Sequence, residues 1–477
     1  MQELWQKTAF ELASDIRSGR VSSVEVTNDI LERMTAVNTT INAVVDTMQE
    51  EALASAREAD NELRKSGPRG PLHGIPVTVK INVDYSGRAT TNGVVAYKDL
   101  LANDDGSVVR NLKNSGAVIF GRTNTPCFSM RLFTSNDLHG ATLNPHDATI
   151  TPGGSSGGAA SATSAGIGAI AHGNDIGGSV RYPAYACGVY GFRPTSGVVP
   201  NHNSSQFAER MIVSQMSSVQ GPLARSVEDL RLAMVAMSAP DPRDIWQVPT
   251  HGMFDPLEIE PCRVAMLSDT NDSDVDPEVS SAIRLAGDML RDAGYSVVEA
   301  EIPSMLDASR FWKTALVNEM LSGSMPKILE LGDGKIKRSV ERFTDGLNVL
   351  ESRDDFLQTF ALRSKMLREW QIFLSEFPLI LTASSWVKPI IDDYDVSADL
   401  DMDWFGRVTA PMHATPILGL PGLAVPVGTV IGKPMGIQMI ANRFEDRRLL
   451  SAGKALEKAL GPLLPIDPQP GAERSSE

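Results

Sequence analysis

The segment TPGGSSGGAAS at residues 151–161 places four glycines around two adjacent serines. Glycine- and serine-rich segments are usually flexible linkers, but here segments typical of α/β structure continue on both sides. A phosphate loop of the GxxxxGK[ST] type needs a lysine after its last glycine, where this chain has Ala159. A dinucleotide-binding loop needs a strong preceding strand, which DATITP at 147–152 does not provide. The sequence therefore favours a loop that carries serine chemistry.

A lysine lies within a segment that is otherwise typical of a buried strand. Apolar residues alternate with polar ones near residues 73–83, and this period of two predicts a strand. The apolar set is Val77, Val79, Ile81 and Val83. Lys80 points to the opposite face in the middle of that strand. Burial disfavours a charged ammonium, so this position could supply a neutral amine that acts as a base.

Two kinds of serine hydrolase fit the glycine-rich loop. Residues 154–158, GSSGG, match G-x-S-x-G and would make Ser156 a nucleophile, but the strong preceding strand of that motif is missing. The later histidines that it would need lie in no telling context: His202, His251 and His413. The second kind uses a lysine base and a second glycine-rich segment, and DIGGS at 175–179 is such a segment. Its backbone N–H groups could turn toward one point and stabilise an oxyanion.

Composition excludes several broad classes. The 477 residues carry a formal net charge of −15, which argues against nucleic acid as a general ligand. Three scattered cysteines fit neither a disulfide framework nor a zinc site, so we expect a reducing, cytoplasmic location. We expect no secretory signal and no membrane partner, because the apolar stretch 416–432 is rich in proline and glycine and fits strand–turn–strand better than a spanning helix.

The pattern of elements predicts one large α/β domain over residues 1–465. Helices are expected over 7–66, a helix and a strand over 107–120, a small-residue helix over 159–170, an α/β unit over 262–299, mainly helices over 301–375 and irregular structure over 376–405. We divide the domain into 1–66 (N-terminal helices), 70–237 (core), 240–405 (variable substrate side) and 410–460 (return to the core). Residues 466–477 are predicted to be a flexible tail.

Taken together, these segments resemble the amidase signature family. The motifs that carry the resemblance are GPLHGIPVTVKINVD (70–84), GRTNTP (121–126), PGGSSGGAAS (152–161), NDIGGSVRYPA (174–184), GFRPTSG (191–197) and QGPLARSVEDL (220–230), with LPGLAVPVG and MGIQMIANRFEDRRLL between 420 and 450. The similarity runs over about residues 8–237 and 410–460, and is weak over 240–405. The resemblance implies a single α/β domain with a central mixed, mostly parallel twisted sheet that helices cover on both faces.

The resemblance also implies the site. Its catalytic triad would be Lys80, Ser155 and Ser179, with Ser179 as nucleophile, Ser155 as bridge and a cis peptide bond between Gly154 and Ser155. The remaining assignments are an oxyanion hole at Ile176, Gly177 and Gly178 (together with Ser179) and supporting residues Gly154, Ser156, Asp175 and Arg181. Apart from the resemblance, the segments 127–134 and 300–405 are rich in apolar and aromatic residues and are predicted to line the substrate pocket. The candidate pocket residues are Cys127, Phe128, Ser129, Met130 and Trp386. No metal and no cofactor are implied.

The activity expected from the resemblance is hydrolysis of a carboxylic amide to a carboxylate and ammonia or an amine, through a Ser179 acyl-enzyme. The substrate would be a small amide with an apolar or aromatic acyl group, and water the second reactant. The main alternative is the glutaminase component of a tRNA-dependent amidotransferase, against which CFSMRLFT at 127–134 argues because such proteins usually carry an acidic residue there. Hydrolysis of esters, hydrazides or carbamates stays open, and a homodimer is a further expectation.

Overall fold

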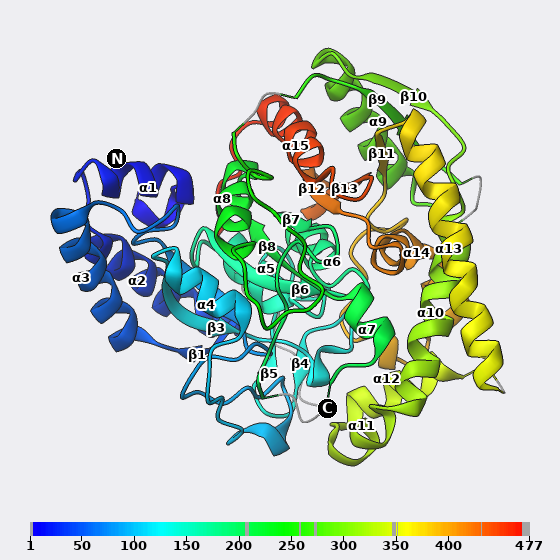
Figure 1. The fold of residues 1–477 in the computed structure, drawn as a ribbon, viewed down its shortest axis with the longest axis horizontal. Coiled ribbons are helices and arrows are strands. Elements are labelled where there is room, and N and C mark those ends of the chain that lie inside the picture. Colours follow the sequence, from blue (N-terminus) through cyan, green and yellow to red (C-terminus); the bar gives the residue numbers. More distant parts are fainter. Residues whose placement is uncertain are drawn as a thin grey trace.

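A computed structural model describes residues 3–205, 209–256, 259–270, 274–345, 350, 352–430 and 432–469. Its centre is an eleven-stranded sheet with the order β1-β3-β2-β6-β8-β7-β12-β13-β11-β9-β10 (Figure 1). The strands are β1 (Val44–Thr47), β2 (Pro76–Lys80), β3 (Val118–Thr123), β6 (Ile170–Asp175), β7 (Tyr190–Arg193), β8 (Val219–Ala224), β9 (Arg263–Met266), β10 (Ser296–Glu299), β11 (Leu379–Thr382), β12 (Gly422–Val430) and β13 (Lys433–Ala441). A separate small hairpin joins β4 (Ser135–Asn136) to β5 (Gly140–Ala141).

The sheet is mixed, as predicted, and its parallel pairs form two blocks. One block joins β3, β2 and β6, and the other joins β11, β9 and β10. The strands between these blocks pair antiparallel, because β6, β8, β7, β12, β13 and β11 follow one another in alternating directions. The expected mainly parallel pairing therefore holds within the two blocks and not across the centre of the sheet.

Helices cover both faces of the sheet. The helices are α1 (Ala9–Arg17), α2 (Ser23–Ile41), α3 (Gln49–Ser66), α4 (Ser107–Asn114), α5 (Gly157–Ser164), α6 (Arg181–Cys187), α7 (Ile212–Ser217), α8 (Val227–Met237), α9 (Pro277–Asp292), α10 (Met305–Ser322), α11 (Met325–Leu331), α12 (Gly334–Thr344), α13 (Arg353–Glu376), α14 (Met402–Leu418) and α15 (Asp446–Leu460). On β12, Gly422 faces Arg181 of α6 and the next residue, Leu423, contacts Gly453 of α15. Since successive strand residues point to opposite faces, α6 and α15 cover opposite faces.

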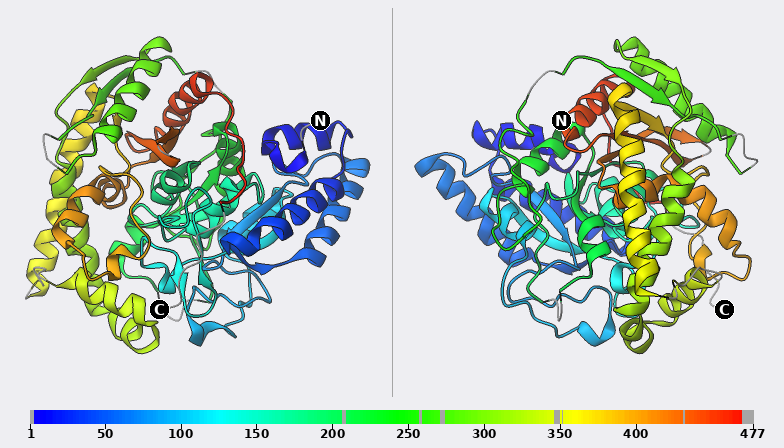
Figure 2. Two further views of the ribbon diagram at one scale, coloured as in Figure 1. Left: turned by 180° about the vertical axis from the view of Figure 1, so that it is seen from behind. Right: turned by 45° about the vertical axis from the view of Figure 1, so that its right-hand side comes forward.

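The N-terminal helices and the helices of the 305–376 region lie at opposite sides of the molecule. Figures 1 and 2 show α1–α3 at one end of the sheet and α10–α13 at the other. Helices α10 and α14 pack together, and α10 also contacts α13 and α7. None of the described helices combines the length and the apolar character needed to cross a membrane.

The structure corrects several expected boundaries. The small-residue helix predicted over 159–170 is α5, which ends at Ser164 because Gly166 and Gly168 have left-handed φ angles of 80° and 82°. Strand β6 begins directly afterwards. The segment 376–405, expected to be irregular, contains the buried strand β11. Its four residues alone give no alternation by which the sequence could have identified them.

The first residues of the predicted flexible tail, 466–469, contact the body of the protein. The N–H of Ile466 donates to Ser164, and that of Gln469 donates to Pro145. Arg33 of α2 pairs with Asp467. The rest of that predicted tail, 470–477, lies outside the described residues.

The small residues of α5 allow close packing of the backbone, as the sequence indicated. A Cβ atom at Gly158 would lie 2.5 Å from the backbone nitrogen of Asn124 and 2.7 Å from the carbonyl oxygen of Ala43. Both are backbone atoms, which cannot rotate away as a side chain can. This contact sets how closely α5, and the serine loop before it, approaches the end of β3.

We expect Gly158→Ala to destabilise the protein by about 1–3 kcal/mol, the usual cost of overpacking a tight site. Gly334→Ala is the matched control, because a Cβ at this helical glycine meets nothing within 4 Å. Urea denaturation followed by circular dichroism measures both. Equal stability of the two variants would contradict the close-packing account.

Candidate functional site

Lys80 is the last residue of β2 and is fully buried. Its Nζ lies 2.7 Å from Ser155 Oγ, 3.1 Å from Ser156 Oγ and 2.8 Å from Asn174 Oδ1. Strands β2 and β6 are parallel neighbours, so Lys80 and the end of β6 meet at the same edge of the sheet. The lysine therefore connects the serine loop to the segment that leads into DIGGS.

A chain of side-chain amides orients Asn174. Its Nδ2 donates to Asn82 Oδ1 at 2.8 Å, and Asn82 Nδ2 donates to Ser129 Oγ at 3.0 Å. Ser129 Oγ in turn donates to Asn92 Oδ1 at 2.6 Å. Because this chain fixes Nδ2 of Asn174 as a donor, Oδ1 is left to face Lys80 as an acceptor.

This arrangement assigns a role to each hydrogen bond of a neutral Lys80 amine. A neutral amine has two N–H donors and one lone pair. One N–H donates to Asn174 Oδ1, which can only accept. The Ser156 hydroxyl donates to the carbonyl oxygen of Asn174 at 3.3 Å, so its oxygen accepts the second N–H. In a neutral amine these two donors would leave the lone pair for Ser155, the nearest hydroxyl.

The environment of Lys80 favours its neutral form. Burial lowers the pKa of Lys80 well below its usual value, and the negative charge of Asp175 opposes this only in part. At the ordinary pKa, only about one lysine in 2,500 would be neutral at pH 7. The burial predicted from the strand pattern is thus present, together with its effect on the pKa.

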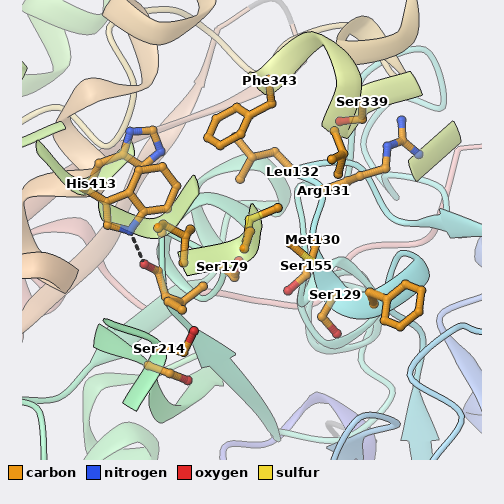
Figure 3. Close-up of a pocket in the computed structure, with 18 of the residues that line it drawn as sticks. Ser129, Met130, Arg131, Leu132, Ser155, Ser179, Ser214, Ser339, Phe343 and His413 are labelled. Carbon is orange, nitrogen blue, oxygen red and sulfur yellow. Dashed lines mark hydrogen bonds between the residues drawn. The ribbon is translucent and has the colours of Figure 1, made fainter. Parts of the chain in front are cut away.

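The two serines of the expected triad line the same cavity. Ser155 and Ser179 are buried, and both have atoms on its wall (Figure 3). The peptide bond between Gly154 and Ser155 is cis, as the resemblance implied. Among the described residues, however, no hydrogen bond joins the hydroxyls of Ser155 and Ser179. Of the expected triad, the structure thus contains the hydrogen bond between Lys80 and Ser155, but not one between Ser155 and Ser179.

A buried carboxylate holds the DIGGS loop. Asp175 accepts the N–H of Gly178 at 2.9 Å and that of Val180 at 3.2 Å, and pairs with the Arg181 guanidinium at 3.0 Å. Arg193 donates to the carbonyl oxygen of Asp175 at 2.6 Å. Burial opposes ionisation, but these two guanidinium groups hold the pKa of Asp175 well below its usual range. The predicted supporting roles of Asp175 and Arg181 thus correspond to direct contacts with the loop.

These contacts correct the expected oxyanion hole. The N–H of Gly178 donates to Asp175 and is therefore not free to face a substrate. Within the described chain, the N–H groups of Ile176, Gly177 and Ser179 have no acceptor, and all three residues line the cavity. The sequence could not show that the carboxylate of the same motif would take one of its N–H groups.

The cavity has a volume of about 380 Å³. Phe128, Ser129 and Met130 line it, as predicted. Cys127 and Trp386, also predicted, do not: Cys127 is packed in a neighbouring apolar cluster, and Trp386 lies in the main core beside a separate cavity. The left-handed φ angles of Phe128 and Ser129, 56° and 57°, explain how the chain turns these two side chains to the cavity while the adjacent Cys127 points away.

Much of the cavity wall comes from residues that the sequence did not single out as pocket residues. Helix α10 presents Ser309, Trp312, Lys313, Leu316 and Met320 at helical spacing, and α12, α14 and the segment after β3 supply further apolar side chains. Figure 3 shows His413, Phe343, Leu132 and Met130 around Ser179 and Ser155. Only the i, i+3, i+4, i+7 spacing on α10 could have indicated this face, and the same spacing is typical of any packed helix.

The alternative nucleophile and its histidines are not assembled. Ser156 is fully buried and does not line the cavity. His413 does line it, but its Nδ1 lies 2.9 Å from Ser309 Oγ, and burial lowers the pKa of His413 to about 3. His172 contacts the Lys80 backbone and Gln220, and burial lowers its pKa to about 4. Both rings are therefore neutral near pH 7.

The described residues contain no group of three or more histidine, cysteine, aspartate or glutamate side chains placed to hold a metal ion. The three cysteines are free thiols. Lys80 lies behind the cavity wall and reaches it through its hydrogen bond to Ser155, which lines the cavity.

The sequence of the chain matches a known protein family. The family model described as Amidase matches residues 25–450. The indoleacetamide hydrolase of Bradyrhizobium diazoefficiens is 44% identical, over 96% of this chain and 88% of that protein. A component of the glutamyl-tRNA(Gln) amidotransferase of Fusobacterium nucleatum is 29% identical, over 96% of this chain and 98% of that one.

A solved structure shares the fold along almost the whole chain. A bacterial aryl acylamidase of the amidase signature family superposes with a TM-score of 0.80 at 25% identity, covering 95% of this chain and 96% of the other. The match of the family model and the 44% identical relative both span most of the sequence. The chain therefore belongs to the amidase signature family and is a hydrolase of amide C–N bonds.

Proposed function

We propose that this enzyme hydrolyses a primary amide with an aromatic acyl group, such as an arylacetamide, to the carboxylate and ammonia. The contact that carries the proposal is the 2.7 Å hydrogen bond between the buried Lys80 Nζ and Ser155 Oγ, beside a cavity that also exposes Ser179. Two further observations support the aromatic substrate. They are the aromatic and apolar cavity wall and the 44% identity to an indoleacetamide hydrolase.

In the proposed mechanism, neutral Lys80 accepts a proton from Ser155, and Ser155 accepts one from Ser179. The Ser179 Oγ attacks the amide carbonyl carbon, and its N–H with those of Ile176 and Gly177 stabilises the oxyanion. The proton then returns through Ser155 to the leaving nitrogen, which departs as ammonia. Water hydrolyses the acyl-enzyme by the same relay.

The relay requires a hydrogen bond from Ser179 to Ser155 that the structure does not contain. Catalytic hydrogen bonds are often long in unliganded sites and tighten when substrate binds. A rotation of the Ser179 side chain about its Cα–Cβ bond is the simplest change that could form it. We therefore assign the closing of this last link to the substrate complex.

The same site is proposed to act in the cytoplasm, which is consistent with three free cysteines. The homodimer stays a prediction that size-exclusion chromatography with light scattering can test.

The alternative of a glutaminase component in an amidotransferase is supported by the more distant relative at 29% identity. It predicts glutamine as the substrate, and the substrate experiment below includes that test.

Replacing Ser179 by alanine, or Lys80 by arginine, should lower kcat/KM by about 10³-fold or more, because the first change removes the proposed nucleophile and the second removes the proposed base. Arginine keeps the positive charge and cannot deprotonate near neutral pH. Hydrolysis of indole-3-acetamide, followed by ammonia release, provides the measurement.

Ser280→Ala and Lys365→Arg are the matched controls for these two variants. Ser280 is a buried serine of α9 whose hydroxyl has no hydrogen-bond partner among the described residues, and Lys365 is an exposed lysine of α13. Both controls should retain wild-type kcat/KM. A Ser179→Ala enzyme with full activity would rule out the proposed nucleophile.

The pH dependence follows from the pKa of Lys80. A base must be deprotonated to act, so kcat/KM should rise with pH through the Lys80 pKa and be constant above it. Because burial lowers that pKa, the midpoint should lie well below the ordinary value of about 10.4. Burial lowers the pKa of His413 to about 3 and that of His172 to about 4, so neither ring changes its charge near neutral pH. A midpoint at or above about 10 would show that the base is an ordinary lysine.

Indole-3-acetamide or 2-phenylacetamide should have a kcat/KM about 100-fold above that of acetamide. An aromatic ring buries about 150–250 Å² when it enters an apolar cavity, and only part of the resulting free energy appears in the rate. Glutamine should be a poor substrate, near acetamide. If glutamine were preferred instead, the amidotransferase component would be the better interpretation of the same catalytic groups.

A further inference from the structure

Trp312 of α10, which none of the sequence motifs includes, lies directly on the DIGGS loop. Its Nε1 donates to the carbonyl oxygen of Ile176 at 2.8 Å. The indole is largely buried and lines the cavity. This helix belongs to the 240–405 segment, where the sequence resembles the family only weakly, yet it contacts the most recognisable loop of the site.

The hydrogen bond acts on one peptide plane. The Ile176 carbonyl and the Gly177 N–H belong to the same peptide unit, and in a trans peptide they point in opposite directions. A donor that holds the carbonyl oxygen on one side therefore fixes the direction of the Gly177 N–H on the other. Accepting a hydrogen bond at the oxygen also polarises the amide, which strengthens its N–H as a donor.

The Gly177 N–H is available for this purpose. It has no acceptor among the described residues, whereas the neighbouring Gly178 N–H is already engaged by Asp175. Glycine at 177 is also what allows the indole to approach. A Cβ atom there would lie 2.5 Å from Trp312 Cζ2.

Surrounding rings keep the indole in place. His413 of α14 stacks on it with ring centroids 4.1 Å apart and an angle of 3° between the planes. Phe343 of α12 meets it edge-on at 6.2 Å. Ser309, one helical turn before Trp312, is hydrogen-bonded to His413 at 2.9 Å, so α10 and α14 hold the stack from both sides.

We propose that Trp312 is a positioning residue, whose indole N–H orients and polarises the Ile176–Gly177 peptide so that the Gly177 N–H can stabilise the oxyanion. This inference rests on the oxyanion role proposed above for that loop. It gives Trp312 two separable functions, since the ring contributes to the wall of the cavity and the N–H acts on the chemistry.

The test replaces the indole N–H and keeps the ring. Trp312→Phe retains an aromatic side chain, and β-(benzothiophen-3-yl)alanine incorporated at 312 keeps the bicyclic shape with sulfur in place of N–H. We expect kcat for indole-3-acetamide to fall about 10-fold in both, less than the ~10²–10³-fold lost when an oxyanion donor is removed outright. KM should change by less than about 3-fold, because the ring contact with substrate is preserved.

The inhibition constant of a compound that forms a tetrahedral adduct with Ser179 is a second measurement. A mere loss of packing around Trp312 would not change it in step with kcat. Ser179 Oγ passes its proton through Ser155 to Lys80 and donates a lone pair into the vacant orbital of phenylboronic acid, which forms the O–B bond. The resulting anionic, tetrahedral boronate presents one of its hydroxyl oxygens to the oxyanion hole. Its Ki should increase about 10-fold, in step with kcat, as expected for an analogue of the transition state. The dissociation constant of planar indole-3-acetate should stay within about 2-fold, since it forms no tetrahedral adduct.

Trp370→Phe is the matched control, because Trp370 is a buried tryptophan of α13 that lies outside the cavity wall. It should keep wild-type kcat and Ki. If the benzothienyl variant also keeps wild-type kcat and boronate Ki, the inference about Trp312 is wrong although the enzyme mechanism stands. If Ser179→Ala were active, the mechanism itself would fail, and the two results are therefore distinguishable.

Discussion

The site depends on a lysine amine that is fully withdrawn from water. Lys80 has 0% exposure, and its three polar neighbours are two hydroxyls and one amide oxygen, none of them charged. An ammonium in such surroundings loses hydration without gaining a direct counter-ion, which is what lowers its pKa. Asp175, whose negative charge acts on Lys80, is itself paired with two arginines, Arg181 and Arg193. In the proposed mechanism, this burial is what makes the amine available as a base.

The strands, loops and helices around Lys80 keep its amine buried. Parallel pairing of β2 with β6 brings Lys80 and the DIGGS loop to one edge of the sheet. Gly158 of α5 packs against backbone atoms of Asn124 and Ala43, which sets the position of the serine loop before it. Asp175 holds the loop by accepting two of its N–H groups. Helices α10 and α14 then close the other side of the cavity.

The sequence predicted the features that depend on local patterns and motifs. It did not predict the contacts that depend on how distant segments pack together. The alternation around Lys80 predicted a buried strand, and the two glycine-rich segments predicted the loops that meet it. The assignment of Gly178 to the oxyanion hole was wrong because the partner of its N–H is a side chain three residues earlier. Trp386 was chosen from a segment rich in apolar residues, where nothing distinguishes a core tryptophan from one at a cavity. Trp312 reaches the site because α10 packs against α14, a contact between segments about 100 residues apart.

A direct titration of Lys80 tests the central claim most directly. Protein labelled with [ε-¹³C]lysine, compared with the Lys80→Arg variant to assign the resonance, reports the pKa of this one amine by NMR. The account predicts a midpoint well below the ordinary lysine value of about 10.4, with the amine neutral through the range in which the enzyme works. A Lys80 resonance that stays in its protonated position up to about pH 10 would contradict it.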